Sequence, residues 1–275
     1  MTVRTNDRAL TSSPRDLART AALRPLHHPV QAVILAAGLG TRLGRTTPKP
    51  LTLLRDGRTI QGRQLEALRA VLGADVDITV VVGHCSELLM QASSDVRFAY
   101  NPEYANTNTS KSLLRGLLTS RYGGVLWLNG DVVFDPAVLE LALPHLLADE
   151  SFVCVDTNTV ADEEVKYTLD VDGCIRELSK TVVEGLGEAV GINYVSAADK
   201  PALIEHLAAC EDQDYFERAI ETAIIEKGLR FRPVDISMFA AVEVDFETDL
   251  HRANALLCGA PAMVPEMADL AAEAG

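Results

Sequence analysis

The stretch AVILAAGLGTRLGRTTPKPL, residues 32–51, begins as a buried strand and ends as a polar, charged loop. The apolar run at 32–36 is followed by Gly38, Gly40 and Arg42, and Lys49 stands between two prolines. The second half shows neither the helical nor the strand period of apolar residues. This change predicts a strand followed by a loop that is shaped for a ligand rather than for a core.

Downstream of this strand, apolar runs alternate with helical patterns. Strands are predicted at 32–36, 77–82, 96–100 and 124–128, and helices at 61–73, from 85 and at 110–119. Such alternation is typical of an α/β fold, and we expect a Rossmann-like, mostly parallel sheet flanked by helices on both faces.

The alternation of predicted strands and helices changes after about residue 150. Two alternating segments flank Asp172-Gly173, a strong hairpin signal. Helices are predicted at 199–209, 215–227 and 247–257, and short strands at 230–235 and 240–244. We expect one domain at 31–258 with a small, hairpin-containing acceptor-binding annex at about 160–235, a loosely ordered arm at 1–30 and a tail at 259–275.

Composition excludes several classes of partner. The net charge of −14 argues against a nucleic-acid or anionic membrane surface. No apolar run approaches the roughly 20 residues of a membrane-spanning helix, so a cytoplasmic protein is expected. The five cysteines are scattered and form no CxxC pair, which favours free thiols over disulfides or a zinc site.

The opening loop follows the first strand of a parallel sheet, at the edge where such sheets bind ligands. Gly38 and Gly40 allow backbone N–H groups to approach phosphate oxygens, and Arg42 and Lys49 supply positive charge. The dinucleotide fingerprint fails because Leu43 replaces its third glycine, and no P-loop is present. A polyphosphate site is therefore predicted, with an ordinary tight turn as the alternative.

Two aspartates end later strands. Asp131 follows the strand at 124–128, and Asp245 ends the segment VEVD. Mg²⁺ next to a polyphosphate typically takes one or two protein carboxylates. Both aspartates are candidate Mg²⁺ ligands, although each is equally typical of a turn or a helix N-cap.

These motifs resemble a known family. LAAGLGTRLGRTTPKPL matches the GxGTR and Pro-Lys signature of the sugar-nucleotidyltransferase-like superfamily. Together with NPEYANTNTSKSLLRGL, NGDVVF, SKTVVEGLGEAVGINYV, YFERAI and VEVDFETDL, it is similar to the small CTP-using branch that holds phosphocholine and phosphonate cytidylyltransferases. The phosphonoformate and hydroxyethylphosphonate enzymes of antibiotic pathways are the most similar, over roughly residues 30–257.

The resemblance implies roles for individual residues. It implies a nucleotide-phosphate site at Gly38, Gly40, Thr41 and Arg42, a catalytic Lys49 at the phosphoryl centre, Mg²⁺ on Asp131 and Asp245, and a catalytic Lys180 near the attacking group. The base is expected between the end of the first strand (Leu35, Ala36 and Ala37) and the residues Gly83, Asn106 and Ser110. Glu217 matches the family pattern on the acceptor side.

The acceptor substrate is the part of the predicted reaction that the sequence determines least. Lys111 lies in the first turn of a predicted helix, where the helix dipole disfavours a cation unless an anion binds there. A solvent-facing lysine is the alternative. An aminoethyl acceptor would need a carboxylate such as Glu188, and phosphocholine would need an aromatic cage, for which Tyr167, Tyr194 and Tyr215 are available.

The sequence therefore predicts an Mg²⁺-dependent cytidylyltransferase that transfers CMP from CTP to a small phosphonate such as phosphonoformate or hydroxyethylphosphonate. The alternatives are a phosphocholine or aminoethylphosphonate acceptor, a sugar-1-phosphate nucleotidyltransferase, and a non-enzymatic nucleotide sensor. A monomer or a homodimer is expected.

Overall fold

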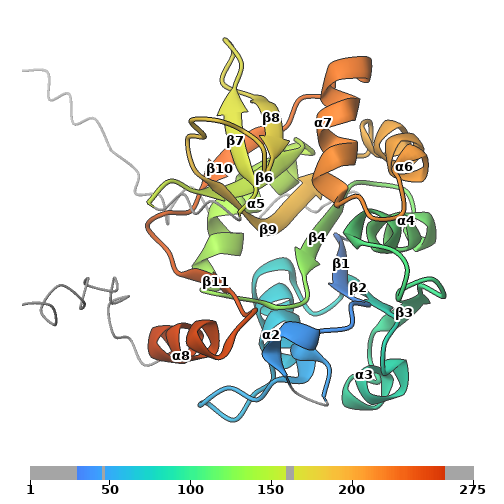
Figure 1. The fold of residues 1–275 in the computed structure, drawn as a ribbon, viewed down its shortest axis with the longest axis vertical. Helices are drawn as coiled ribbons and strands as arrows, with labels where there is room; N and C mark the ends of the chain where they lie inside the picture. The colour runs from blue at the N-terminus through green and yellow to red at the C-terminus, as the bar shows by residue number, and fades with distance from the viewer. Residues whose placement is uncertain (1–29, 45–46, 159–163, 258–275) are drawn as a thin grey trace, which may run out of the picture.

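The computed structural model describes residues 30–44, 47–158 and 164–257 (Figure 1). The predictions of an N-terminal arm at 1–30 and a tail at 259–275 fall outside these residues, apart from Val30.

A mixed sheet forms the centre of the fold. Its main path runs β10-β6-β9-β4-β1-β2-β3, and within that path β9 alone runs against the other described strands. The strands are β1 (Gln31–Ala36), β2 (Asp77–Val82), β3 (Arg97–Tyr100), β4 (Val125–Asn129), β6 (Phe152–Asp156), β9 (Glu188–Val195) and β10 (Arg232–Asp235). The predicted fold class, a mostly parallel sheet between helices, is confirmed.

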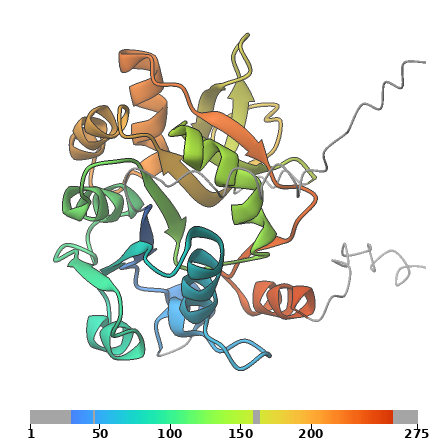
Figure 2. The same ribbon diagram turned by 180° about the vertical axis from the view of Figure 1, so that it is seen from behind.

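Helices cover both faces because the strands are apolar on both sides. In β1, Ala32 and Ile34 pack in one cluster with α2 and α5, whereas Val33 and Leu35 pack in another with α4, α6 and α7. The helices are α2 (Ile60–Leu72), α3 (Ser86–Ala92), α4 (Thr109–Thr119), α5 (Ala137–Ala148), α6 (Lys200–Ala209), α7 (Phe216–Lys227) and α8 (Glu247–Leu256). Figure 2 shows α5 lying across the back of the sheet.

A two-stranded ribbon lies beside the main sheet. β5 (Val132–Phe134) pairs antiparallel with β11 (Ala241–Glu243), and Val132 is opposite Glu243. Two short 3₁₀ turns, η1 (Thr41–Leu43) and η2 (Lys49–Leu51), lie in the loop after β1. The ribbon brings the segment before α8 next to the end of β4, although more than a hundred residues separate them in sequence.

The predicted hairpin is present as β7 (Lys166–Leu169) and β8 (Ile175–Ser179). Gly173 has a φ of +76°, which glycine adopts without strain, and the backbone N–H of Cys174 donates to Asp170 at 2.9 Å. However, β9 and β10 fall in the range expected to form an annex and belong to the main sheet. The hairpin and its connections therefore extend from the sheet and do not form a separate layer.

Besides β5 and the two 3₁₀ turns, three elements were not predicted. α5 is apolar on most sides and contains Pro144, so it lacks a clear helical period. β6 is a short apolar run, which periodicity does not distinguish from a buried helix segment. β9 contains Gly191 at a φ of +70°, an unusual conformation inside a strand.

Among the described residues, no helix is both long and apolar enough to cross a membrane. The cysteines in this part of the chain, at positions 85, 154, 174 and 210, are free thiols, of which Cys154 and Cys174 are buried.

Candidate active site

A cleft lies at the carboxyl ends of β1 and β4, which pair in parallel with Leu35 opposite Asn129. It is bordered by the loop after β1, by the segment that leads into α4, by the turn after β4 and by β11. Its lining residues are Leu35, Ala36, Ala37, Gly38, Gly40, Lys49, Pro50, Tyr104, Thr107, Asn108, Thr109, Ser112, Asn129, Gly130, Asp131 and Glu243. This is the sheet edge at which the sequence predicted a ligand.

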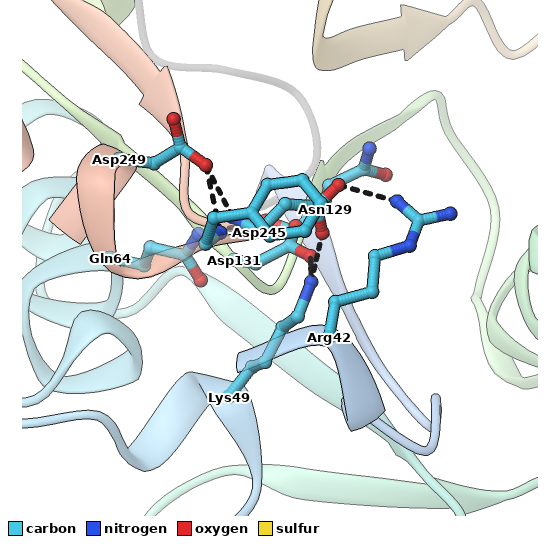
Figure 3. A network of polar contacts seen from close by, with 8 residues as sticks. Arg42, Lys49, Gln64, Asn129, Asp131, Asp245 and Asp249 are labelled. Atoms are coloured by element: carbon cyan, nitrogen blue, oxygen red, sulfur yellow. Dashed lines mark hydrogen bonds and ion pairs between the residues drawn. The ribbon is translucent and has the colours of Figure 1, made fainter. Parts of the chain in front are cut away.

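The glycine loop holds Lys49 in place. Gly40 has a φ of +63°, and a Cβ at this position would lie 3.2 Å from Cγ of Lys49. Pro48 precedes the η2 turn and Pro50 is buried, so the backbone on either side of Lys49 is fixed. The lysine backbone is therefore rigid, and the end of its side chain points into the cleft (Figure 3).

Asp131 is placed by close backbone packing. The N–H of Gly130 donates to the carbonyl of Leu35 at 2.9 Å, and a Cβ on Gly130 would lie 2.5 Å from that oxygen. From α2, the buried amide of Gln64 donates to the carbonyls of Asn129 and Val132, both at 2.8 Å. The turn that carries Asp131 is thus fixed from two sides.

Asp245 lies far from Asp131 in sequence, between β11 and α8. The N–H of Val244 donates to the carbonyl of Asp131 at 3.0 Å, which extends the ribbon between β5 and β11. The Asp249 carboxylate accepts from the N–H groups of Asp245 at 3.2 Å and of Phe246 at 2.8 Å. The start of α8 therefore fixes the backbone that carries Asp245.

Two cations and two carboxylates meet at the cleft, which Lys49 and Asp131 line and which Arg42 and Asp245 adjoin (Figure 3). The Lys49 ammonium lies 3.3 Å from Oδ2 of Asp131 and also contacts Oδ1 of Asp245. The Arg42 guanidinium lies 2.6 Å from Oδ2 of Asp245. Arg42, Lys49, Asp131 and Asp245, which the sequence identified as candidates, thus lie together in the structure.

The charged groups in this cluster shift one another's pKa values. Burial acts to lower the pKa of Lys49, but the carboxylates of Asp131 and Asp245 outweigh it and raise the pKa. Burial acts to raise the pKa of Asp245, but its contacts with Lys49 and Arg42 hold that pKa below the usual value. For Asp131, burial prevails and the pKa is raised despite Lys49. Lys49 and Asp245 are therefore charged at neutral pH.

A third acidic residue, Glu243, completes the group. One carboxylate oxygen from each of Asp131, Glu243 and Asp245 lies within 4.8 Å of the others. Desolvation in the cleft and the charges of Asp131 and Asp245 raise the pKa of Glu243 well above its usual value. Three carboxylates that each offer a hard oxygen donor are a ligand set that fits a divalent cation such as Mg²⁺.

Glu243 was not predicted from the sequence, although a signal was present. Glu243 and Asp245 stand two residues apart at the end of a strand, and alternate residues of a strand face the same side. Once Asp245 is a candidate ligand, Glu243 belongs to the same face.

Of the residues predicted to bind the base, Leu35, Ala36 and Ala37 line the cleft, but two near the start of α4 do not. Ser110 is fully buried and Asn106 uses its carbonyl to accept from Gln213 at 2.6 Å, and neither lines the cleft. Thr109 and Ser112 line it instead, since residues three apart share a helix face. Gly83 lies behind the cleft wall, because a Cβ there would lie 2.5 Å from Cβ of Tyr104. Thr41 is the first residue of η1.

A second hollow, of about 370 Å³, lies between β8 and the start of α7. In it, the Lys180 ammonium lies 5.0 Å from the centre of the Tyr215 ring, which is cation–π distance. Glu217 is 8% exposed and its Oε2 has no hydrogen-bond partner. Burial raises the pKa of the Glu217 carboxyl to about 7, which Lys180 partly opposes. The hollow adjoins the cleft, because Thr109, which lines the cleft, accepts at 3.2 Å from the N–H of Phe216, between Tyr215 and Glu217.

The structure corrects the prediction for Lys111. Its ammonium donates to the carbonyls of Leu207, at 3.4 Å, and of Ala208, at 3.2 Å, and also contacts that of Cys210. These carbonyls lie at the C-terminal end of α6, where a cation is favoured. The lysine at the start of α4 is therefore explained by a neighbouring helix end, and no bound anion is needed.

Most of the other residues predicted for acceptor binding lie outside the cleft and the hollow. Glu188 begins β9 opposite Asp156 and lines neither the cleft nor the hollow in the described chain. Tyr167 is buried in the core, and the buried Tyr194 donates its hydroxyl to Asp149 at 2.6 Å. Of the three tyrosines considered for a choline cage, Tyr215 is the one that lines the hollow.

Fold and site together define a protein that can hold a polyanion and a hard cation at the edge of a mostly parallel sheet. The family model described as the MobA-like NTP transferase domain matches residues 32–227, and the chain belongs to this family. The resemblance to nucleotidyltransferases inferred from the sequence is thereby confirmed.

Two curated relatives extend this relationship. The chain is 32% identical over 256 residues to a CMP-5'-(3-aminopropyl)phosphonate synthase of Streptomyces rubellomurinus, a match that covers 82% of this chain and 38% of that protein. It is 27% identical over 229 residues to a 2-aminoethylphosphonate cytidylyltransferase of Lancefieldella rimae, covering 77% and 87%. The chain thus spans well under half of the first relative and most of the second.

Solved structures share the fold. The inositol-1-phosphate CTP transferase from T. maritima aligns with a TM-score of 0.68 at 15% identity, over 85% of this chain and 99% of that one. The CTP:phosphocholine cytidylyltransferase from Streptococcus pneumoniae aligns with a TM-score of 0.63 at 20% identity, over 84% and 100%.

Gln64 is expected to support the site through the backbone. Gln64→Met removes both donors to the Asn129 and Val132 carbonyls, which should lower the free energy of unfolding by about 1–3 kcal/mol and weaken nucleoside triphosphate binding. Gln61→Met is the matched control, since Gln61 is equally buried on α2 but donates to Ser93. Urea unfolding and calorimetric titration measure the two effects. Equal triphosphate affinity in both variants would contradict the role of Gln64.

Proposed function

We propose that this protein is a cytidylyltransferase that transfers CMP from CTP to a small phosphonate and releases pyrophosphate. The observation that carries the proposal is the convergence of Arg42 and Lys49 with three carboxylates at the end of β1 and β4. Family membership and the two phosphonate-linked relatives support it. A role in phosphonate natural-product biosynthesis is part of the proposal.

Nucleotidyl transfer depends on positioning and charge neutralisation more than on covalent help from the protein. A phosphonate oxygen is already a nucleophile at neutral pH, so no general base is required. That oxygen attacks the α-phosphorus of CTP and the bond to pyrophosphate breaks. Arg42 holds the departing pyrophosphate, and Lys49 stabilises the charge that develops at the phosphoryl centre.

Asp131 and Asp245 would hold Mg²⁺, and Glu243 lies within reach as a third oxygen donor. When bound, the metal neutralises phosphate charge and aligns the triphosphate. The chain contributes the rigid turn at Asp131 and the anchored start of α8, so the two carboxylates are oriented before the nucleotide arrives.

The acceptor is proposed to bind in the hollow beside the cleft. Lys180 would contact the phosphonate, since it extends from the end of β8 into the hollow. In the same hollow, the buried Glu217 carboxylate, whose Oε2 has no hydrogen-bond partner, favours an acceptor that carries an ammonium group. Among the acceptors considered from the sequence, an aminoalkylphosphonate is therefore favoured over phosphonoformate or hydroxyethylphosphonate.

The reaction is tested with a panel of nucleoside triphosphates and acceptors, read by pyrophosphate release and by ³¹P NMR of the product. We expect CTP with a small phosphonate to be the best pair. Asp131→Asn should reduce turnover by more than about 100-fold, because loss of a metal ligand exceeds the effect of losing a supporting residue.

The matched control for this variant is Asp135→Asn. Asp135 precedes α5 and accepts from the N–H of Ala137 at 2.9 Å, a hydrogen bond that the side-chain oxygen of asparagine can also accept. Thermal melting should show that both variants stay folded. Normal turnover by Asp131→Asn would refute the metal assignment, and turnover of a sugar phosphate in place of every phosphonate would refute the acceptor class.

Glu217→Gln tests the amine-binding role. The variant should lower kcat/KM for 2-aminoethylphosphonate by roughly 10- to 100-fold, the effect of losing a charged hydrogen bond, and leave hydroxyethylphosphonate unaffected. With a pKa near 7, Glu217 ionises as pH rises from 6 to 8, so the KM for the amine should fall over this range in the wild type but not in the variant.

The thermal stability of the protein should fall with rising pH, whereas amine binding should improve. A carboxyl pKa raised from 4.5 to about 7 means that the folded state loses stability as pH rises from about 4.5 to about 7, so Glu217→Gln should melt higher than the wild type at pH 8 and nearly equally at pH 4.5. Glu221→Gln is the control, because Glu221 lines the same hollow but already binds Leu178 and Arg218. An equal loss of amine turnover in both variants would refute the assignment.

A further inference from the structure

The Lys49 ammonium occupies the place between the two metal-binding carboxylates. It lies 3.3 Å from Oδ2 of Asp131 and contacts Oδ1 of Asp245, while its side chain is only 12% exposed. An ammonium at this position takes the oxygens that a divalent cation would use. A metal ion and this ammonium therefore compete for the same oxygens, and they would repel each other at close range.

The second cation adds to this competition. Arg42 lies 2.6 Å from Oδ2 of Asp245, so both oxygens of that carboxylate have cationic partners. Glu243 is the remaining member of the acidic group. While these contacts persist, a free metal ion would meet two carboxylates that already have cationic partners.

We propose that Lys49 is a placeholder cation which keeps the metal site closed until a nucleotide arrives, so that metal and nucleoside triphosphate bind together. The inference rests on the proposed function. The triphosphate offers Lys49 and Arg42 new anionic partners, which releases Asp131 and Asp245 to the metal. Because coupling between two ligands is reciprocal, the metal strengthens triphosphate binding by the same factor.

The structure around Lys49 allows its ammonium to move from the carboxylates to a phosphate. The prolines at 48 and 50 fix the backbone, and Gly40 lies against Cγ of Lys49, so the base of the side chain is held. The Cδ, Cε and Nζ atoms remain free to rotate from the carboxylates to a phosphate. The change needs rotamers of one flexible side chain and no movement of the sheet.

The experiment measures Mn²⁺ binding by electron paramagnetic resonance, with and without a non-reactive methylene analogue of CTP. The proteins are the wild type, Lys49→Met and Lys227→Met. Methionine keeps most of the apolar stem, and Lys227→Met removes the same charge from an exposed residue that pairs with Glu205. Thermal melting checks that each variant is folded.

Without nucleotide, Lys49→Met should bind Mn²⁺ at least tenfold more tightly than the wild type and Lys227→Met. The analogue should raise Mn²⁺ affinity more in the wild type than in Lys49→Met. Equal Mn²⁺ affinity of the free wild type and Lys49→Met, with the analogue still binding, would overturn the placeholder role and leave the proposed function standing. Failure of the wild type to bind the analogue would overturn both.

Discussion

The contact of the Lys49 ammonium with Asp131 and Asp245 is the interaction on which the site depends. It joins three segments that are distant in sequence: the loop after β1, the turn after β4 and the start of α8. Two half-buried carboxylates at this distance would repel each other without a cation between them. The ammonium makes their approach possible, and the rigid backbone around each residue keeps the arrangement ready for a metal and a polyphosphate.

Much of this arrangement could be predicted from the sequence because it rests on local patterns. The alternation of apolar runs with helical periods indicated the sheet, and the position of Gly38 and Gly40 after its first strand indicated the cleft. Asp131 and Asp245 both follow strands, and the family motifs joined them to Arg42 and Lys49. The chemistry of these residues is encoded within a few positions of each, so the sequence reveals it.

What the sequence did not reveal depends on contacts between distant segments. Lys111 looked like an anion-binding residue until α6 placed its terminal carbonyls beside it. Tyr167 is buried in the core cluster that includes residues of α6 and α7, and Tyr194 is buried where β9 pairs with β4 and β6. Glu217 reads as a surface charge on a helix, and its burial follows from how α7 packs against the sheet. Side-chain surroundings of this kind are set by tertiary packing and not by spacing.

The most direct test of this account is anomalous diffraction from crystals of the protein grown with Mn²⁺ and a non-reactive CTP analogue. We expect a manganese peak bound by Asp131 and Asp245, with the triphosphate in contact with Arg42 and with Lys49 moved from the carboxylates to a phosphate. A manganese peak away from these aspartates, or a triphosphate bound outside the cleft at the end of β1 and β4, would contradict it.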